Sequence, residues 1–385
     1  MPSPRTLFIS LLMLSAACRT GTAAERAISV ADNPAKIQTR IAIQGVCAWP
    51  NLQQLPDGTL LAVIYNQPSH GRWEGELDCW ASSDQGQTWR FRGRVVQHQP
   101  GTNRMNCAAG FARNGDLVVL SSGYTNRLPN PLKPFAQPVK PRPGRRFLPT
   151  CVCRSSDGGR TWEVNEKFPA PPDTELGRKN HFVPFGNIMA ARDGSLCASV
   201  YLKRGNERAC YLVRSRDDGR TWGEAMVLNP RGNETSILHL GDGRWLAASR
   251  EFRERPDVHL ELFRSSDDSK TWRRDGPLTL PLQVTGHLMR LQDGRILLSY
   301  GNRNWNNFGV DVLFSDDEGA TWGPPIRVAD AEDADCGYPS GVQLLDGRVV
   351  TAYYTRISED FHYEMRVAIW RPGAFATTGR PDVNP

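Results

Sequence analysis

The sequence lacks the features that mark nucleic-acid-binding, nucleotide-dependent and membrane-spanning proteins. Its 385 residues carry a formal net charge of +6, yet basic and acidic residues are interleaved without long runs of one sign, so no nucleic-acid-binding patch is expected. Beyond the first residues of the chain, no apolar stretch is long enough to span a bilayer. There is no glycine-rich nucleotide loop, no His-x-x-x-His pair and no acidic calcium loop, so we expect no cofactor.

Cysteine is present, but without the spacing of a metal site. Of the nine cysteines, Cys151 and Cys153 are separated by one residue, and no second pair stands at the distance that a zinc site needs. Cys197 and Cys210 fall on two segments that can pair as strands, which allows a disulfide between them. Buried free thiols are the alternative for these two residues.

The N-terminus has the pattern of a secretory signal peptide. Arg5 precedes a short apolar run and a stretch of small residues. Cleavage after Ala24 fits a small-residue site, while cleavage before Cys18 would give a lipoprotein; Ser15 stands where a lipobox usually carries an aliphatic residue. We therefore predict a signal peptide over 1–24 and a single domain over 25–385, secreted or periplasmic, with lipidation through Cys18 as the alternative.

An eight-residue motif, Ser-x-Asp-x-Gly-x-Thr-Trp, recurs along the chain. Its Asp, Ser and Thr side chains can bond backbone groups of their own turn, Gly supplies a left-handed residue, and Trp can anchor the turn on a core. The fourth copy has Ser269 in place of Gly. The five copies span residues 82–89, 155–162, 215–222, 265–272 and 315–322.

A second series consists of hairpin turns between apolar runs. Asn-Gly or Asp-Gly between alternating hydrophobic residues is a strong signal for a β-hairpin. The turns fall at 57–58, 114–115, 193–194, 242–243, 293–294 and 346–347, and the first five interleave with the eight-residue motif. The sequence therefore predicts an all-β fold, a six-bladed β-propeller with four-stranded antiparallel blades.

The last blade lacks the eight-residue motif and ends near the C-terminus. Its strands are expected around 349–354 and 365–370, and an N-terminal strand near 37–43 is expected to complete it, since closure removes open sheet edges. The segment 124–148, rich in Pro and basic residues, is expected to be an inserted loop.

Both series together resemble the sialidase (neuraminidase) superfamily, in which the eight-residue motif is known as the Asp box. The resemblance covers nearly the whole mature chain and implies a glycoside hydrolase with a glycan or glycoside substrate. In that family the Asp boxes lie far from the active site, so we expect all five to be structural.

Counting eight residues back from each hairpin gives equivalent positions that should face the centre of the propeller. These are Trp49, Asn106, Phe185, Glu234, Thr285 and Tyr338. The resemblance implies that Tyr338 is the nucleophile and that Glu234 activates it. A neutral tyrosine suits a sugar whose anomeric carbon carries a carboxylate, because an anionic nucleophile would be repelled.

The family also binds the substrate carboxylate with three arginines. Arg250 and Arg303 resemble the second and third, and bidentate pairing with a carboxylate explains the choice of Arg. Ala48, two residues before Pro50, occupies the position of the first arginine. Arg104 is a candidate to replace it from the second blade.

The acid/base Asp of the family has no counterpart in the loop 69–76. Glu74 is our preferred proton donor and His70 the alternative, because a carboxylic acid near apolar groups is the usual donor to a glycosidic oxygen. Trp49, His70, His181 and His287 are further candidates to line a substrate pocket; packed, hydrogen-bonded histidines are the alternative for the last two.

Three functions remain open from the sequence. The first is an exo-acting, retaining glycosidase of the sialidase type, acting on a sialic acid or a related sugar. The second is a sugar-binding propeller without turnover, which the missing first arginine favours. The third is a purely structural or assembly propeller. A glycosidase or polysaccharide lyase of the same fold that acts on a different sugar is a further alternative.

Overall fold

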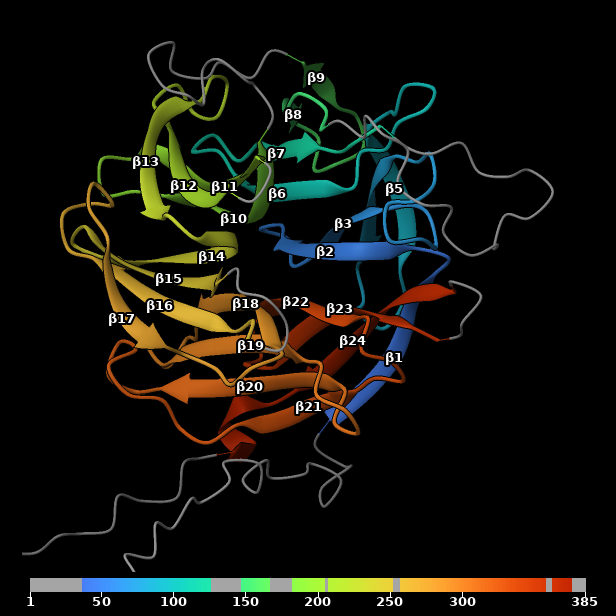
Figure 1. Cartoon of the computed structure of the whole chain (residues 1–385). Helices are drawn as coiled ribbons and strands as arrows, with labels where there is room; N and C mark the ends of the chain where they lie inside the picture. The colour runs from blue at the N-terminus through green and yellow to red at the C-terminus, as the bar shows by residue number, and fades with distance from the viewer. Residues whose placement is uncertain are drawn as a thin grey trace, which may run out of the picture.

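The computed structural model describes residues 37–125, 147–166, 182–204, 207–251, 257–357 and 362–375. The predicted signal peptide, most of the predicted insertion over 124–148, and His181 lie outside these residues. The described part is all-β apart from one 3₁₀ turn, Pro372–Phe375. Its sheets are arranged around a common centre (Figure 1).

Four of the sheets have four strands each. The first contains β2 (Cys47–Gln54), β3 (Leu60–Tyr65), β4 (Leu77–Ser82) and β5 (Arg90–Val96). Another contains β14 (Gly232–Gly241), β15 (Arg244–Glu251), β16 (Leu260–Ser265) and β17 (Arg273–Pro277). The next contains β18 (Gln283–Arg290), β19 (Ile296–Asn302), β20 (Gly309–Ser315) and β21 (Ile326–Asp330). The last contains β22 (Cys336–Gln343), β23 (Val349–Arg356), β24 (Tyr363–Trp370) and β1 (Ile37–Gln44).

The remaining strands form one sheet of eight, where the sequence predicts two separate blades. Its strands are β6 (Asn106–Phe111), β7 (Leu117–Ser122), β8 (Cys151–Ser155), β9 (Glu163–Asn165), β10 (Val183–Ala190), β11 (Leu196–Arg204), β12 (Glu207–Ser215) and β13 (Gly223–Asn229). A short parallel pairing of β6 with β10 joins the two halves. Gly110 permits this approach, because a Cβ there would lie 2.3 Å from the carbonyl oxygen of Ile188.

The Asp boxes form self-contained hydrogen-bonded turns, as predicted. In the first, Ser82 Oγ donates to Asp84 Oδ1 over 2.7 Å and accepts from the Gly86 amide over 2.8 Å. The Thr88 amide and hydroxyl both donate to the Asp84 carboxylate, and the Trp89 indole donates to the Gly86 carbonyl. Burial alone would raise the pKa of Asp84, but the bonds from Thr88 and Ser82 lower it to about 2. The Ser–Asp–Thr bonds recur in the other four copies.

The fourth Asp box keeps this geometry without glycine. Ser269 adopts a left-handed φ of 65°, a conformation that costs a residue with a Cβ more than it costs glycine. Its amide donates to Ser265 Oγ over 3.0 Å, and its hydroxyl accepts from Arg214 over 2.9 Å. The added side-chain bond to Arg214 offsets the backbone strain.

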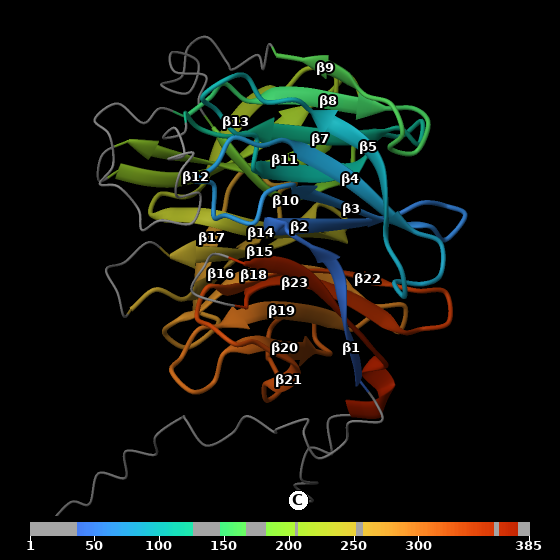
Figure 2. The same cartoon turned by 90° about the vertical axis from the view of Figure 1, so that its right-hand side faces the viewer.

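The last sheet is closed by the N-terminal strand, as the sequence predicts. β1 pairs antiparallel with β24, and the register places Ile37 opposite Trp370 and Arg40 opposite Val367. In Figure 2, β1 runs beside the strands of this last sheet. Both ends of the described chain therefore belong to one sheet, and the hydrogen-bonding edge of β24 is covered.

The hydrophobic core is divided into layers between neighbouring sheets. One layer packs Leu52 and Ile64 of the first sheet against Val350 and Val367 of the last, and all four side chains are buried. A separate cluster around Tyr338 fills the centre of the molecule. The core therefore fixes the angle between adjacent sheets, and thereby the positions of the strand ends that meet at the centre.

The eight described cysteines are free and buried. Cys197 and Cys210 do lie on paired strands, β11 and β12, but the register places Cys197 opposite Arg214 and Cys210 opposite Tyr201. The two thiols are therefore not a cross-strand pair, and the free-thiol alternative describes them. Among the described residues, no helix is long and apolar enough to cross a membrane.

Candidate active site

Irregularities in the innermost strands direct side chains toward the centre. The pairing register shifts in β2, β10, β14, β18 and β22, in each case next to a position counted back from a hairpin. A bulge re-aims the side chain that it carries. Three of these positions are in ring contact: Tyr338 with Trp49 and with Phe185. Three of the six counted positions, Trp49, Phe185 and Tyr338, therefore meet in one aromatic cluster.

Tyr338 and Glu234 form the core of the site. The Tyr338 hydroxyl donates to Glu234 Oε1 over 2.7 Å, and both side chains are buried. Burial, together with the charge of Glu234, raises the pKa of Tyr338 above its usual value. The phenol is therefore neutral in the resting site and lies next to a carboxylate that can accept its proton.

Arg250 connects to both of these groups. Its Nη1 lies 2.5 Å from Glu234 Oε2 and 3.2 Å from the Tyr338 hydroxyl. Burial would lower the pKa of Arg250, but the charge of Glu234 raises it. The Nε atom of Arg250 is buried and has no hydrogen-bond partner among the described residues. Part of this guanidinium therefore remains available to an acceptor from a ligand.

Arg303 lies on another side of Tyr338. Its guanidinium carbon is 5.3 Å from the centroid of the Tyr338 ring, a cation–π distance. Nε and Nη2 donate to the carbonyl of Cys336, and Nη2 lies 3.4 Å from the Tyr354 hydroxyl. The two arginines expected from the resemblance are thus both at the cluster, Arg250 at the hydroxyl of the phenol and Arg303 over its ring.

Ala48 occupies a fully buried position beside Trp49. It brings no polar side chain to the site, and the Trp49 indole stacks on Tyr338 instead, with ring centroids 4.8 Å apart. An apolar wall therefore stands where the family has its first arginine.

Sequence reasoning missed a carboxylate next to this wall. Asp335 accepts hydrogen bonds from the hydroxyls of Tyr354 and Tyr363, each over 2.6 Å, and its Oδ1 lies 3.2 Å from His70 Nδ1. Burial alone would raise the pKa of Asp335, but His70 and the charge of Arg303 bring it below the usual range. Its position three residues before Tyr338, immediately before the same inner strand, is the signal that could have revealed it.

Glu74 lies outside this set of contacts. Its Oε2 is 3.5 Å from His98 Nε2, and among the described residues no hydrogen bond or ion pair joins it to Tyr338 or Glu234. His70, from the same loop, packs edge-on against Trp49 with ring centroids 5.9 Å apart. The loop therefore presents His70, and not Glu74, to the central rings.

Arg104 also lies apart from the central groups. It is buried, its Nη1 donates to the Pro149 carbonyl over 3.0 Å, and its Nη2 is 3.9 Å from Glu166. Within the described residues, no hydrogen bond or ion pair links it to Tyr338 or Glu234. Its contacts hold the start of β8 and do not replace the missing arginine.

His287 lines a small cavity behind Tyr338. This cavity, of about 20 Å³, is too small for a sugar and is lined by Trp49, Asn51, Phe185 and Ser340, among others. His287 Nε2 lies 3.1 Å from Asn187 Nδ2, and burial lowers its pKa to about 4. His287 is thus a neutral histidine packed in the interior, which agrees with the alternative of a packed, hydrogen-bonded residue.

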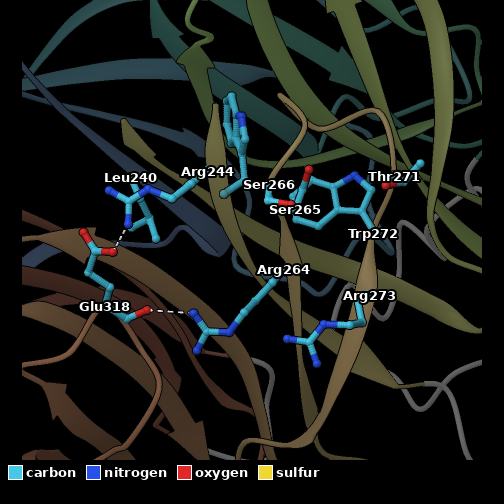
Figure 3. Close-up of a pocket in the computed structure, with 10 residues that line it drawn as sticks. Leu240, Arg244, Arg264, Ser265, Ser266, Thr271, Trp272, Arg273 and Glu318 are labelled. Atoms are coloured by element: carbon cyan, nitrogen blue, oxygen red, sulfur yellow. Dashed lines mark hydrogen bonds and ion pairs between the residues drawn. The ribbon is translucent and has the colours of Figure 1, made fainter. Parts of the chain in front are cut away.

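A larger cavity, of about 320 Å³, lies beside the fourth Asp box and shares no lining residue with the central cluster. Figure 3 shows the guanidinium groups of Arg244 and Arg264 turned toward Glu318: Arg244 forms an ion pair with this residue, and Arg264 donates to its carbonyl over 2.9 Å. Arg264 and Arg273 also pair with Asp275. The cavity lies between the fourth and fifth Asp boxes. Its cations are already paired within the protein, so they are not free to bind an anionic ligand.

The described residues contain no group of three or more His, Cys, Asp and Glu side chains that could hold a metal ion. The polar groups that the structure brings together at the centre include the phenols of Tyr338, Tyr354 and Tyr363, the carboxylates of Glu234 and Asp335, the guanidinium groups of Arg250 and Arg303, and the His70 imidazole.

Comparison with known proteins identifies the family. A model of the BNR repeat-like domain matches residues 141–351. The chain belongs to the BNR repeat-like family. The curated relatives include the sialidase of Micromonospora viridifaciens, 26% identical over 276 residues, and that of Clostridium perfringens, 24% identical over 218 residues. The matches cover 64% and 52% of this chain but 41% and 54% of these relatives, so the chain spans about half their length or less. The predicted resemblance to the sialidase superfamily is confirmed.

Solved structures agree on the fold. A Dyadobacter fermentans protein of unknown function superimposes with a TM-score of 0.69 at 23% identity, covering 86% of this chain and 98% of that one. A Hadza microbial sialidase gives 0.64 at 16% identity, covering 88% and 66%, and Trypanosoma rangeli sialidase gives 0.62 at 14%, covering 87% and 56%. At these identities the likeness shows a shared fold and leaves activity to be argued from the site.

Proposed function

We propose that the protein is a glycoside hydrolase of the sialidase type that releases a terminal sialic acid or a related sugar with retention of configuration. The observation that carries the proposal is the 2.7 Å hydrogen bond from Tyr338 to Glu234 in a buried site flanked by Arg250 and Arg303. In the first step the Tyr338 oxygen attacks the anomeric carbon while Glu234 takes its proton. Water then releases the sugar from the tyrosine.

Burial and charge support these roles. A tyrosine whose pKa is raised is a poor nucleophile until a base removes its proton, and Glu234 is the carboxylate in direct contact with it. Arg250 and Arg303 supply positive charge beside the phenol, which stabilises the negative charge that develops on its oxygen.

For the architecture, we propose that the eight-stranded sheet comprises two blades, which would make a six-bladed propeller. The sheet divides at the short β6–β10 pairing into two sets of four strands, each built like the other sheets. For the location, we propose export through the N-terminal signal peptide of residues 1–24, with lipidation at Cys18 as the alternative.

A second candidate function is a carbohydrate-binding propeller without turnover. The observation in its favour is Ala48, which leaves the site without the first of the three arginines expected from the family. Such a protein would bind a glycan with Arg250 and Arg303, and would have no need for the Tyr338–Glu234 contact.

The test is hydrolysis of a panel of aryl glycosides, sialic acid derivatives included, by the purified mature chain. Tyr338→Phe and Glu234→Gln are each expected to lower kcat by about 10³-fold or more. Tyr353→Phe, which alters an equally buried tyrosine in a different core layer, is the matched control. Glycan binding with no release from any substrate would favour the binding propeller, and release that survives both site substitutions would refute the assigned roles.

A further inference from the structure

We propose that His70, held by Asp335, is the group that protonates the leaving oxygen and later activates water in this reaction. The inference rests on the proposed glycosidase function and assigns the proton donor that this function requires. His70 would be the catalytic acid and base, and Asp335 a positioning residue.

Asp335 is fixed from three directions. Its two carboxylate oxygens accept from the hydroxyls of Tyr354 and Tyr363, and its own amide donates to Asp333 over 2.7 Å. Burial raises the pKa of both tyrosines, so each remains a donor. Oδ1, which accepts from Tyr354, is also the oxygen that lies next to His70.

His70 is oriented by this carboxylate. Nδ1 lies 3.2 Å from Asp335 Oδ1, which places Nε2 on the opposite side of the imidazole ring. The side chain of His70 is 33% exposed and that of Asp335 is 28% exposed. The arrangement matches a general acid and base whose tautomer is set by a partly buried carboxylate, which leaves its second nitrogen for a substrate.

The position of His70 relative to Tyr338 fits the two ends of a glycosidic bond. Trp49 contacts both rings, with centroid distances of 5.9 Å to His70 and 4.8 Å to Tyr338. Tyr354 also contacts both, over 6.2 Å and 5.6 Å. His70 and Tyr338 thus share two aromatic neighbours, Trp49 and Tyr354, which places the imidazole and the phenol in one cluster at the site. Glu74 has no such contact within the described residues and pairs with His98.

The proton balance closes with these groups alone. As the Tyr338 oxygen bonds to the anomeric carbon, Glu234 takes the phenol proton, the bond from that carbon to the leaving oxygen breaks, and protonated His70 gives its proton to that oxygen. Neutral His70 then takes a proton from water, whose oxygen bonds to the anomeric carbon. The bond to Tyr338 breaks and the phenolate recovers its proton from Glu234.

Leaving-group dependence provides the test. With the sugar identified by the panel, His70→Ala is expected to lower kcat by about 10²–10⁴-fold on phenyl glycosides, whose leaving group needs a proton. Attack on dinitrophenyl glycosides, whose leaving group needs none, should form the tyrosyl intermediate at nearly the wild-type rate, so a burst of dinitrophenol is expected. Azide, a nucleophile that needs no base, should then restore turnover. His70→Gln repeats the test with a bulkier side chain, and His98→Gln is the matched control on the neighbouring histidine.

Asp335→Asn separates positioning from simple support of the fold. It is expected to lower kcat on phenyl glycosides by about 10-fold or more, with KM and circular dichroism unchanged. Equal losses by His70→Ala on both leaving groups, or the acid-deficient pattern in Glu74→Gln instead, would overturn the assignment while Tyr338 and Glu234 kept their roles. A wild-type protein inactive on every glycoside would refute the proposed function, and this inference with it.

Discussion

The indole of Trp49 lies nearly parallel to the phenol of Tyr338, with ring centroids 4.8 Å apart and an interplanar angle of 19°. Phe185 packs edge-on against the same phenol at 6.0 Å, and the Arg303 guanidinium lies 5.3 Å from its centroid. The ring of Tyr338 is therefore held between apolar and cationic neighbours, while its hydroxyl is held by Glu234. Packing of the ring sets the direction from which the oxygen can attack.

Trp49→Ala should therefore impair both stability and catalysis. Loss of a large buried aromatic side chain costs about 3–5 kcal/mol of unfolding free energy, and a phenol free to tilt should lower kcat more than it changes KM. Trp49→Phe keeps a stacking ring and should cost less on both measures. Urea denaturation and steady-state kinetics check this; an alanine variant as stable and active as the wild type would show that the stack has no role.

His287 should make stability depend on pH in the weakly acidic range. Burial lowers its pKa from 6.5 to about 4, so between these values the unfolded chain binds a proton that the folded chain does not. Its contribution to the free energy of unfolding thus decreases as the pH falls, by about 3 kcal/mol over the window. His287→Gln should flatten the profile of stability between pH 7 and pH 4, whereas His98→Gln, at a half-buried ion pair, serves as the comparison. Identical slopes in wild type and His287→Gln would contradict the prediction.

The Asp boxes should contribute to stability without affecting the chemistry. Asp317 accepts from the Ser315 hydroxyl and from the amide and hydroxyl of Thr321. Asp317→Ala removes these bonds and should cost about 1–3 kcal/mol, while Asp316→Ala, at the exposed neighbouring position, should cost much less.

Hydrogen bonds from Thr321, opposed by burial, lower the pKa of Asp317 to about 2. Its stabilisation is therefore present above about pH 4 and is lost as the pH falls toward 2. Thermal unfolding of both variants at pH 7 and pH 3 gives the measurement. A large loss of kcat in the folded Asp317→Ala protein would contradict a purely structural role.

The thiols should be unreactive until the protein unfolds. The eight described cysteines are buried and free, and burial raises the pKa of Cys79, Cys107, Cys197 and Cys210 to about 12, so little thiolate exists at neutral pH. A disulfide-exchange reagent should therefore label none of them in native residues 25–385 and all eight in denaturant. Fewer than eight after unfolding would reveal a disulfide; Cys151 and Cys153, with sulfurs 3.8 Å apart, would be the first pair to examine.

Local patterns predicted those parts of the fold that depend on nearby residues. The hairpin predicted at 57–58 lies directly before β3 (Leu60–Tyr65), and the Asp boxes form hydrogen-bonded turns. Counting back from the hairpins also predicted that Glu234 and Tyr338 occupy equivalent positions facing the centre, because the inner strands share one register. Bulges at that register then turn both side chains to the centre.

Features that depend on the approach of distant segments could not be read in this way. The joining of two predicted blades depends on close contact between Gly110 and Ile188, residues from different repeats. The anchoring of Asp335 uses hydroxyls from β23 and β24. The direction of side chains on the loop 69–76 determines that His70, and not Glu74, contacts Trp49 and Asp335, and loop direction has no periodic signal in sequence.

The pairing of β1 with β24 has a consequence for the order of folding. The strand that completes the last sheet is the first described segment to be synthesised, and its partner is among the last. Most sheets can form from consecutive residues, but the last sheet cannot be completed until nearly the whole polypeptide is released, and such distant contacts form slowly. Until then the edge of β24 is open to another molecule. A chain that lacks the β1 strand would keep that edge of β24 open permanently. Such a chain should self-associate through this edge before the inner strands unfold.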